Sequence, residues 1–310
     1  MPKRHSVLMH YRTRQPTRWR GLKVFCSTLL GIIGLGTLVL TPAAFANTHV
    51  VAVGDVALCQ QHFSQSMAAK TAQLVPEDAT VLLLGDTTYP ALDAEHFDNC
   101  FNPTWGKFLA RTYAVAGNHD IVDHSDAFFL KTFNRPVGRK AYFRAPLGED
   151  AWVIGLDSNL KDEALAQQLQ WLEHELKNLH DERCLIAMWH HATLSTGLHR
   201  GDGDALKPAW NLLNAARADL ILSGHEHFYE SFDPKDANGQ PVSDGIREFV
   251  VGTGGALLVD VGIAQGQRRL LREFGLLGLS FHDHQIDWAF HSVTGKTYDE
   301  GHSECRRYRH

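Results

Sequence analysis

The chain is 310 residues long, with 44% hydrophobic and 21% charged residues and a formal net charge of −5 at pH 7. Such proportions exclude a low-complexity chain and are typical of a globular protein long enough for one large domain with a substantial core. The acidic balance also excludes nucleic acid and anionic membrane surfaces as long-range partners, because both are negatively charged.

The first 46 residues differ in character from the rest and predict export. They contain seven Lys and Arg and no Asp or Glu, a mostly apolar stretch over residues 24–40, and the small-x-small pattern Ala44-Phe45-Ala46. We therefore expect a signal peptide over residues 1–46 and a periplasmic or secreted mature chain over residues 47–310. An uncleaved membrane anchor is the alternative, because about 17 apolar residues reach the lower limit of a membrane span. Cleavage leaves 23 basic and 35 acidic residues, a charge of −12.

Five short apolar segments of the mature chain have the pattern of buried strands, and each ends at polar residues. With those polar residues they cover residues 50–55, 80–86, 112–120, 184–191 and 219–227. Side chains at the carboxyl ends of neighbouring strands converge on one crevice of an α/β sheet. We therefore expect the five motifs to form one site. The motifs are Gly54-Asp55, Gly85-Asp86 with Tyr89, Gly117-Asn118-His119-Asp120, His190-His191 and Gly224-His225-Glu226-His227.

The remaining patterns predict three helices, at residues 60–74, 163–179 and 206–216. Further strands are expected at residues 141–144, 152–156, 248–251, 276–281 and 285–290, and a surface loop at residues 233–244. Helices that alternate with this many strands predict an α/β fold in which two packed mixed β-sheets are flanked by helices.

Four cysteines remain after cleavage, an even number that suggests two disulfides in an exported chain. Cys59 and Cys100 follow the first two motif-bearing strands, so both are expected near the rim of the site. Cys184 begins the strand of the fourth motif, and six residues at about 3.3 Å each separate it from the rim by roughly 20 Å, beyond disulfide reach. We therefore pair Cys59 with Cys100, and Cys184 with Cys305.

The five motifs, in this order, resemble those of the calcineurin-like metallophosphoesterases, and more narrowly those of the purple acid phosphatases. That family carries GD-x-G, GD-x-x-Y, GNH-[DE], a strand-terminal His and GH-x-H. The resemblance runs from about Val50 to Cys305 and implies a four-layer α/β/β/α sandwich. Tyr89 stands where the purple subgroup places a ligand that replaces a His of the wider superfamily, whereas Ala57 departs from the glycine usual in the subgroup.

The resemblance implies two metal sites that share Asp86. Asp55, Asp86, Tyr89 and His227 would hold the first metal, and Asp86, Asn118, His190 and His225 the second. The first set offers three anionic oxygens, which suit Fe(III). The second set is neutral apart from the shared carboxylate, which suits divalent Fe(II), Zn or Mn. Two such metals clamp the attacking and leaving oxygens of a phosphoryl displacement.

Catalysis then needs an acid for the leaving alkoxide, since a metal-bound hydroxide would attack phosphorus directly. His119 is the first candidate, because its neighbour Asn118 is a ligand and Asp120 could orient or charge its ring. His199 is the second candidate. It lies nine positions after His190, an offset at which the purple acid phosphatases have a substrate-facing His.

Three nearby polar residues are assigned to other roles. His191 is expected to face away from the metals, since successive strand residues point to opposite faces. Glu226 is expected to be a loop residue. Arg200 could contact a phosphate, but we assign it to a solvated loop. The glycines of residues 252–255 lack the lysine of a phosphate-binding loop and predict a tight turn.

The function predicted from these residues is that of an exported, dinuclear-metal phosphatase that hydrolyses phosphomonoesters at acidic to neutral pH. A phosphodiesterase or nucleotide phosphohydrolase on the same core is the alternative, because pocket shape decides between the ester types. A non-catalytic, metal-binding envelope protein is a further alternative. The expected partner is a small phosphate ester, with no nucleic acid and no stable membrane association after signal cleavage, and the oligomeric state stays open.

Overall fold

The computed structural model describes residues 47–59, 66–136, 138–259 and 267–308. The expected signal peptide and the first part of the helix expected at residues 60–74 lie outside these ranges. In the ranges that are described, no helix combines the length and the apolar character that a membrane crossing requires.

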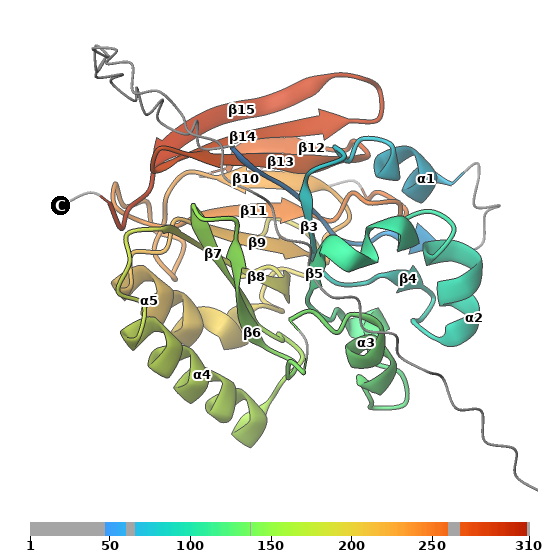
Figure 1. The fold of residues 1–310 in the computed structure, drawn as a ribbon, viewed down its shortest axis with the longest axis horizontal. Coiled ribbons are helices and arrows are strands. Elements are labelled where there is room, and N and C mark those ends of the chain that lie inside the picture. Colours follow the sequence, from blue (N-terminus) through green and yellow to red (C-terminus); the bar gives the residue numbers. More distant parts are fainter. Residues whose placement is uncertain (1–46, 60–65, 137, 260–266, 309–310) are drawn as a thin grey trace, which may run out of the picture. The chain divides into compact units, whose positions relative to one another are not determined.

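Six strands form the first mixed sheet, in the order β15-β14-β13-β1-β3-β5 (Figure 1). β1 (Thr48–Val53), β3 (Thr80–Leu83) and β5 (Thr112–Ala114) are parallel, and β13 (Gly275–His282), β14 (Gln285–Ser292) and β15 (Thr297–Glu304) continue the sheet with antiparallel pairing. In the parallel register, Val50 pairs with Thr80, and Val81 pairs with Thr112. The parallel strands therefore end at one edge of the sheet.

Seven strands form the second mixed sheet, in the order β12-β10-β11-β9-β8-β7-β6. β7 (Ala151–Gly155), β8 (Cys184–His191), β9 (Leu220–Gly224) and β11 (Arg247–Val251) are parallel. β6 (Phe143–Leu147), β10 (Tyr229–Phe232) and β12 (Gln267–Leu271) pair antiparallel. Because β8 and β9 are parallel, the polar motifs at their carboxyl ends lie at the same edge of this second sheet.

The two sheets pack face to face and helices cover their outer faces, which confirms the expected α/β architecture (Figure 1). Alternate residues of β1 show how the sequence produces these layers. Val50 and Ala52 belong to the core between the sheets, whereas Val51 and Val53 belong to the core under the helices. A strand that is apolar on both faces is therefore buried on both faces.

Two of the expected helices are confirmed: α4 (Asp162–Lys177) and α5 (Lys207–Ala215) pack on the seven-stranded sheet. α1 (Met67–Ala72) begins later than the expected residue 60, since Ser66 has an extended backbone and caps the helix by accepting a hydrogen bond from the Ala69 amide. The other helical segments are α2 (Ala94–His96), η2 (Phe97–Phe101), η3 (Gly106–Arg111), η4 (Asn118–Asp120), α3 (Ala127–Thr132) and η5 (Asp204–Leu206).

Several strands have no counterpart among the expected ones, namely β10, β12, β15 and the short ladder of β2 (Ala57–Leu58) with β4 (Thr88–Tyr89). Ala57 is buried and pairs with Thr88, so the alanine that replaces the usual glycine fits a regular parallel register. Residues 233–244 connect β10 to β11 as a loop, as expected, with an isolated bridge between Lys235 and Pro241.

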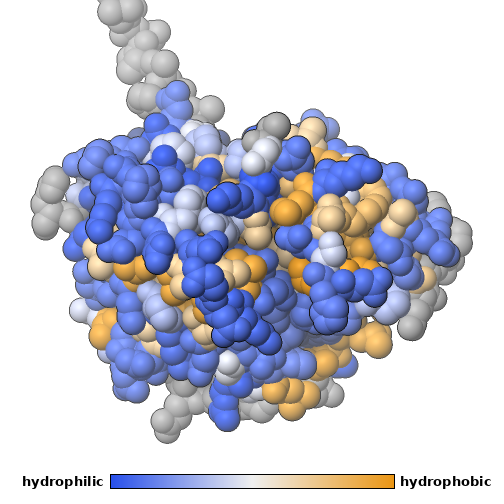
Figure 2. Space-filling model, turned by 90° about the horizontal axis from the view of Figure 1, so that it is seen from below, coloured by the Kyte–Doolittle hydropathy of each residue, from blue (hydrophilic) through white to orange (hydrophobic). Residues whose placement is uncertain are grey.

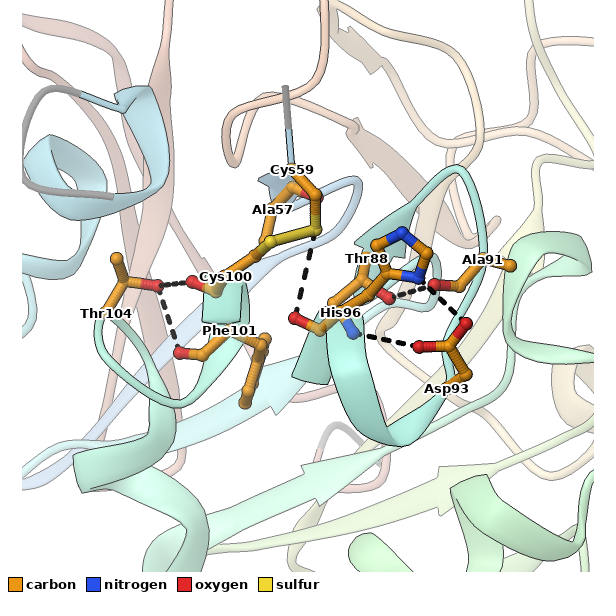
Figure 3. The surroundings of a disulfide bond; sticks show 9 residues. All are labelled: Ala57, Cys59, Thr88, Ala91, Asp93, His96, Cys100, Phe101 and Thr104. Carbon is orange, nitrogen blue, oxygen red and sulfur yellow. Dashed lines mark hydrogen bonds and ion pairs between the residues drawn. A yellow bond between two sulfur atoms is a disulfide. The ribbon is translucent and has the colours of Figure 1, made fainter. Parts of the chain in front are cut away.

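Both expected disulfides are present, Cys59–Cys100 and Cys184–Cys305. The first joins the residue after β2 to η2, with Cα atoms 5.4 Å apart, beside the helix α2 that Asp93 caps (Figure 3). The second has Cα atoms 5.1 Å apart and joins the first residue of β8 to the residue after β15. It therefore links the two sheets.

The face of the molecule shown in Figure 2 is mostly hydrophilic, with apolar residues in separate patches. Among the described residues, the large apolar side chains that are exposed are Leu198, Val242, Leu257 and Tyr308. Leu198 precedes His199, and the backbone oxygen of Leu257 contacts the ring of His227. Two of these exposed side chains therefore lie in segments that border the expected site.

Candidate metal centre

The carboxyl ends of parallel strands from both sheets bring the expected ligands together. The six-stranded sheet contributes oxygen donors: Asp55 follows β1, Asp86 follows β3 and Asn118 follows β5. The seven-stranded sheet contributes ring nitrogens, because His190 lies near the end of β8 and His225 follows β9. Tyr89 in β4 and His227 before β10 complete the set.

The four side chains of the first expected metal set meet at the Tyr89 hydroxyl. That oxygen lies 2.7 Å from Asp55 Oδ1, 2.8 Å from Asp86 Oδ2 and 3.0 Å from His227 Nε2. His227 Nε2 is also 3.4 Å from Asp55 Oδ1. Three oxygens and one nitrogen thus face a common point, which is an arrangement that can hold a hard cation.

The second expected set meets at Nε2 of His190. This atom lies 3.4 Å from Asp86 Oδ2, 3.2 Å from Asn118 Oδ1 and 3.2 Å from His225 Nδ1. Asp86 Oδ2 touches both sets, as a bridging carboxylate must. Donor atoms of Asp55, Asp86 and His190 all lie within 4.8 Å of one another, so the donor set fits two closely spaced metal ions.

The second ring nitrogen of each histidine is held by another group. Nδ1 of His190 lies 2.8 Å from the Leu84 carbonyl oxygen, and Nδ1 of His227 lies 2.9 Å from that of Leu257. Nε2 of His225 lies 3.0 Å from Asp202 Oδ2. Such partners fix the orientation of a ligating imidazole and leave its other nitrogen free to face a metal.

The backbone that positions these ligands is strained. Asp55, Asp86 and His225 have φ angles of 60°, 51° and 71°, in the left-handed region that residues other than glycine rarely adopt. Strain of this kind clusters at functional sites. The ligands also need glycine neighbours: a Cβ on Gly117 would lie 2.1 Å from Asp86 Oδ1, and one on Gly85 would lie 2.6 Å from His190 Nδ1.

The charges of the buried side chains favour the binding of a cation at this centre. Burial, and then the charges of Asp55 and Asp86, raise the pKa of Tyr89 well above its usual value. Burial lowers the pKa of His190, but the adjacent Asp86 carboxylate outweighs it and raises that pKa to about 10. In the metal-free protein, a protonated His190 therefore partly balances two buried carboxylates. Bound metal ions would balance them and would allow Tyr89 to ionise.

His119 lies at the edge of the centre. Its Nδ1 is 2.6 Å from the Pro90 carbonyl oxygen, its amide donates to Asp86 Oδ1, and its ring centre is 4.5 Å from that of Tyr89. Nδ1 is thus hydrogen-bonded to the backbone, so Nε2 is the ring nitrogen that can exchange a proton with a bound substrate.

Asp120 occupies a different position from the one expected for a partner of the His119 ring. Its buried carboxylate accepts hydrogen bonds from the amides of Asp86, Thr87 and Gly117 and from the Thr87 hydroxyl. Burial raises the pKa of Asp120 to about 6. Asp120 therefore holds the loop that carries Asp86, and in the described part of the chain its carboxylate makes no hydrogen bond to the ring of His119.

His199 lies beside the second set, on the loop after β8. Its ring centre is 4.5 Å from that of His225, and its Nδ1 is 3.6 Å from Asp202 Oδ2. The side chain is 54% exposed, so it is open to solvent beside this set. The structure thus brings His199 next to the expected ligand His225 and to Asp202.

Three buried glutamates, which we call the glutamate clamp, hold the loop of His199: Glu226, Glu230 and Glu248. The donors are the amides of Thr193 and Leu194 to Glu248, the amide and hydroxyl of Thr196 to Glu230, and the Ser195 hydroxyl and the His199 amide to Glu226. Burial raises the pKa of Glu248 to about 8, so at neutral pH the contacts of this group are hydrogen bonds to a neutral carboxyl. The loop is therefore fixed along its length up to His199.

Sequence reasoning missed the position of His191. Its ring centre is 4.4 Å from that of His225, although strand alternation predicts that it faces away from the metals. The ladder between β8 and β9 shifts register between Met188 and His191, which turns the side chain back. Nδ1 of His191 lies 2.7 Å from the Ser158 hydroxyl, and burial, together with His190 and His225, lowers its pKa to about 3.

Asp202 and the turn over residues 252–255 were also missed. The Asp202 carboxylate contacts the His225 ring, but Asp202 lies on a loop whose sequence has no motif that would predict this role. The amides of Gly254 in the turn and of Ala256 just after it donate to the carbonyl oxygens of Gly54 and Asp55, so this segment, expected only to form a turn, supports a ligand.

The sequence profile of the calcineurin-like phosphoesterase family matches residues 48–229. A purple acid phosphatase from yellow lupin (Lupinus luteus) seeds superposes with a TM-score of 0.65 at 16% identity, over 84% of this chain and 54% of the lupin protein. The chain therefore spans about half of that enzyme. GAP50, the anchor in the inner membrane complex of Plasmodium, superposes with a TM-score of 0.63 at 14% identity, over 84% of this chain and 90% of that protein. PhoD gives 0.55 at 12% identity, over 83% and 68%.

Proposed function

The chain belongs to the calcineurin-like phosphoesterase family, and we propose that it is an exported phosphatase of the purple acid phosphatase type with two metal ions. The observation that carries this proposal is the pair of donor sets joined by Asp86 Oδ2, which lies 2.8 Å from the Tyr89 hydroxyl and 3.4 Å from His190 Nε2. Each expected ligand belongs to one of these sets.

The metal ions are assigned by the chemistry of the donors. Asp55, Asp86, Tyr89 and His227 would hold Fe(III), and Asp86, Asn118, His190 and His225 would hold Fe(II), Zn or Mn. Bound there, the two ions would supply an activated water for direct attack and would neutralise charge on the transferring phosphoryl oxygens. Within the protein, backbone carbonyls and Asp202 orient the three histidine rings.

The protein's own part in the reaction is to orient the ester and to move a proton. Nδ1 of His119 is held by Pro90, and Nε2 has no hydrogen-bond partner among the described residues, so we assign His119 to protonate the leaving alkoxide. We assign His199 to contact the phosphate, at the end of the loop that the glutamate clamp holds. The exposed side chains of Leu198 and Leu257 border this space and suit the organic part of an ester.

Leaving-group protonation is tested by changing the leaving group. His119→Ala should reduce kcat/KM for an alkyl phosphate by about 10²-fold or more and for nitrophenyl phosphate far less, since nitrophenolate departs without a proton. His96→Ala is a matched control, because His96 lies on α2 and is not in the centre. Equal losses on both esters would remove the acid role from His119.

The Fe(III) assignment predicts colour. Iron-loaded protein should show a visible absorption from the Tyr89 phenolate, and Tyr89→Phe should abolish it while elemental analysis still finds iron. A colourless Fe(III) protein, or colour that survives Tyr89→Phe, would reject Tyr89 as a ligand.

Two further points of the proposal rest on separate observations. Two disulfides are typical of proteins in oxidising compartments, which supports a periplasmic or secreted location. A monoester substrate is proposed over a diester or nucleotide substrate, and parallel assays with nitrophenyl phosphate and bis-nitrophenyl phosphate decide between them.

A non-catalytic role is the second candidate, and it is favoured by the fold likeness to GAP50, which is described as an anchor. A protein of this kind would need neither a free Nε2 on His119 nor a clamped loop carrying His199. Metal-loaded protein without turnover on a broad panel of phosphate esters would favour this role over the phosphatase.

A further inference from the structure

Behind the loop of His199 lies a cavity of about 550 Å³ that the proposed reaction does not use. One wall is the clamped loop, including Thr193 and Ser195, and the opposite wall comes from the segment after β10, including Lys235. Phe232 and Ala237 add an apolar floor. The cavity is thus a built space between two ordered segments.

The charge of this cavity is opposite to that of the protein. Its lining contains three basic residues, Arg200, Lys207 and Lys235, and one acidic residue, Asp204. Asp204 lies 2.8 Å from Lys207 and pairs with it. In the described part of the chain, neither Arg200 nor Lys235 forms an ion pair. The lining therefore has more basic than acidic side chains, in a chain that has 30 basic and 35 acidic residues in all.

Lys235 is the least expected of these residues because it is only 6% exposed. Its ammonium group donates to the Gly239 carbonyl oxygen at 3.1 Å and lies 5.5 Å from the centre of the Phe232 ring. A buried ammonium group without a carboxylate partner is costly. An anion in the cavity would supply the missing partner of Lys235.

The cavity adjoins the metal centre. Thr193 is three residues beyond His190, and three extended residues span at most about 11 Å. Ser195 lines the cavity and donates to Glu226, which lies between His225 and His227 in the chain. Arg200 follows His199 and lines the cavity at the same loop. The cavity and the metal centre therefore border the same loop, the one that carries His199.

We propose that this cavity binds the second phosphate group of a substrate that carries two, while the metal centre binds the phosphate that is hydrolysed. Arg200 and Lys235 hold the distal phosphate. This inference rests on the proposed phosphatase function and names its substrate class, which is a small bisphosphorylated ester.

The test compares two esters that differ only in the distal phosphate, hexyl phosphate and hexanediol bisphosphate, on metal-loaded protein. The ratio of their kcat/KM values should favour the bisphosphate by about tenfold or more, since a hydrogen bond to a charged group contributes enough free energy for that factor. Lys235→Met keeps the apolar stem and should lower the ratio about tenfold, mainly through KM. Arg200 is exposed, so Arg200→Gln tests contact with the same phosphate at a position that the core does not depend on.

The matched control is Lys177→Gln on α4, which removes one positive charge outside the cavity and should leave the ratio unchanged. A wild-type ratio near one, or a ratio that Lys235→Met and Arg200→Gln leave unaltered, would overturn the proposal. If these variants weaken only the binding of free sulfate, measured by calorimetry, the cavity is a site for a free anion and the substrate assignment is wrong. If neither ester is hydrolysed, the phosphatase function fails. Calorimetric affinities for the two esters then still decide whether the cavity prefers the second phosphate.

Discussion

The two ends of the paired sheets differ in how their polar groups are satisfied. At the carboxyl ends of the parallel strands, Asp55 and Asp86 are buried together and have left-handed backbones. At the amino ends, Cys184 at the start of β8 is bonded to Cys305, and the buried Arg306 follows it. The carboxyl ends thus hold the buried carboxylates of the proposed metal centre on left-handed backbones, and the amino ends tie the two sheets together.

Arg306 shows how completely the amino end is paired. Its amide donates to Asp219, and its guanidinium contacts Asp244 and the carbonyl oxygen of Ala218. Thr48, the first residue of β1, donates to Asp150 at 2.6 Å, next to the start of β7. Both contacts join one sheet to the other. The comparison predicts that substitutions at the carboxyl ends change chemistry, whereas those at the amino ends change stability.

Asp86→Asn should have the largest effect on chemistry. It removes the shared carboxylate, so metal content should fall and kcat should drop by about 10³-fold or more, because metal ions contribute several kcal/mol of charge stabilisation. The melting temperature of the metal-free variant should stay near that of the metal-free wild type, since a repulsive charge is lost as well. Elemental analysis, ester turnover and calorimetry measure the three quantities.

The control for Asp86→Asn is Asp78→Asn, at a carboxylate that is 66% exposed and precedes β3. It should retain both metals and full activity. A metal-loaded, active Asp86→Asn protein would contradict the bridging role and with it the functional half of the comparison.

The Cys184→Ala/Cys305→Ala double variant tests the structural half. The disulfide closes a segment of 121 residues and links the sheets, so its loss should lower the free energy of unfolding by about 2–5 kcal/mol. Metal content and kcat at 25 °C should stay near the wild-type values. Denaturant unfolding measures the stability, and a variant of normal stability with reduced metal content would reverse the assignment of the two ends.

The fold was largely predictable where local sequence determines it. The five motif-bearing strands are apolar on both faces, and each ends at a polar motif, so their positions and their common edge followed from composition. β15 was not predictable, because its sequence is polar and it becomes a strand only by pairing with β14 at the edge of the sheet. β10 was missed because the buried Glu230 lies in its middle.

The site was predictable only in part. The motifs identify the residue types and the order of the expected metal ligands. Their roles in metal binding stay predictions. The register shift that turns His191 inward depends on pairing between β8 and β9, which no local pattern encodes. Likewise, Asp202 and the glutamate clamp act through contacts between segments distant in sequence, so their residues look like ordinary loop or strand residues when read along the chain.

Glu226→Gln should have the smallest effect, and it asks whether the clamp serves chemistry or stability. The amide oxygen can still accept from Ser195 and from the His199 amide, but without charge, so these contacts weaken by about 1 kcal/mol. A looser His199 should lower kcat for alkyl phosphates about three- to tenfold with little change in KM.

Glu248→Gln is the matched control, because Glu248 belongs to the same clamp but contacts Thr193 and Leu194 rather than His199. This variant should lower the melting temperature more than it lowers kcat. Equal kinetic losses in both variants would mean that the clamp only stabilises the loop. The carboxyl ends of the parallel strands would then contain residues that serve stability as well as residues that serve chemistry.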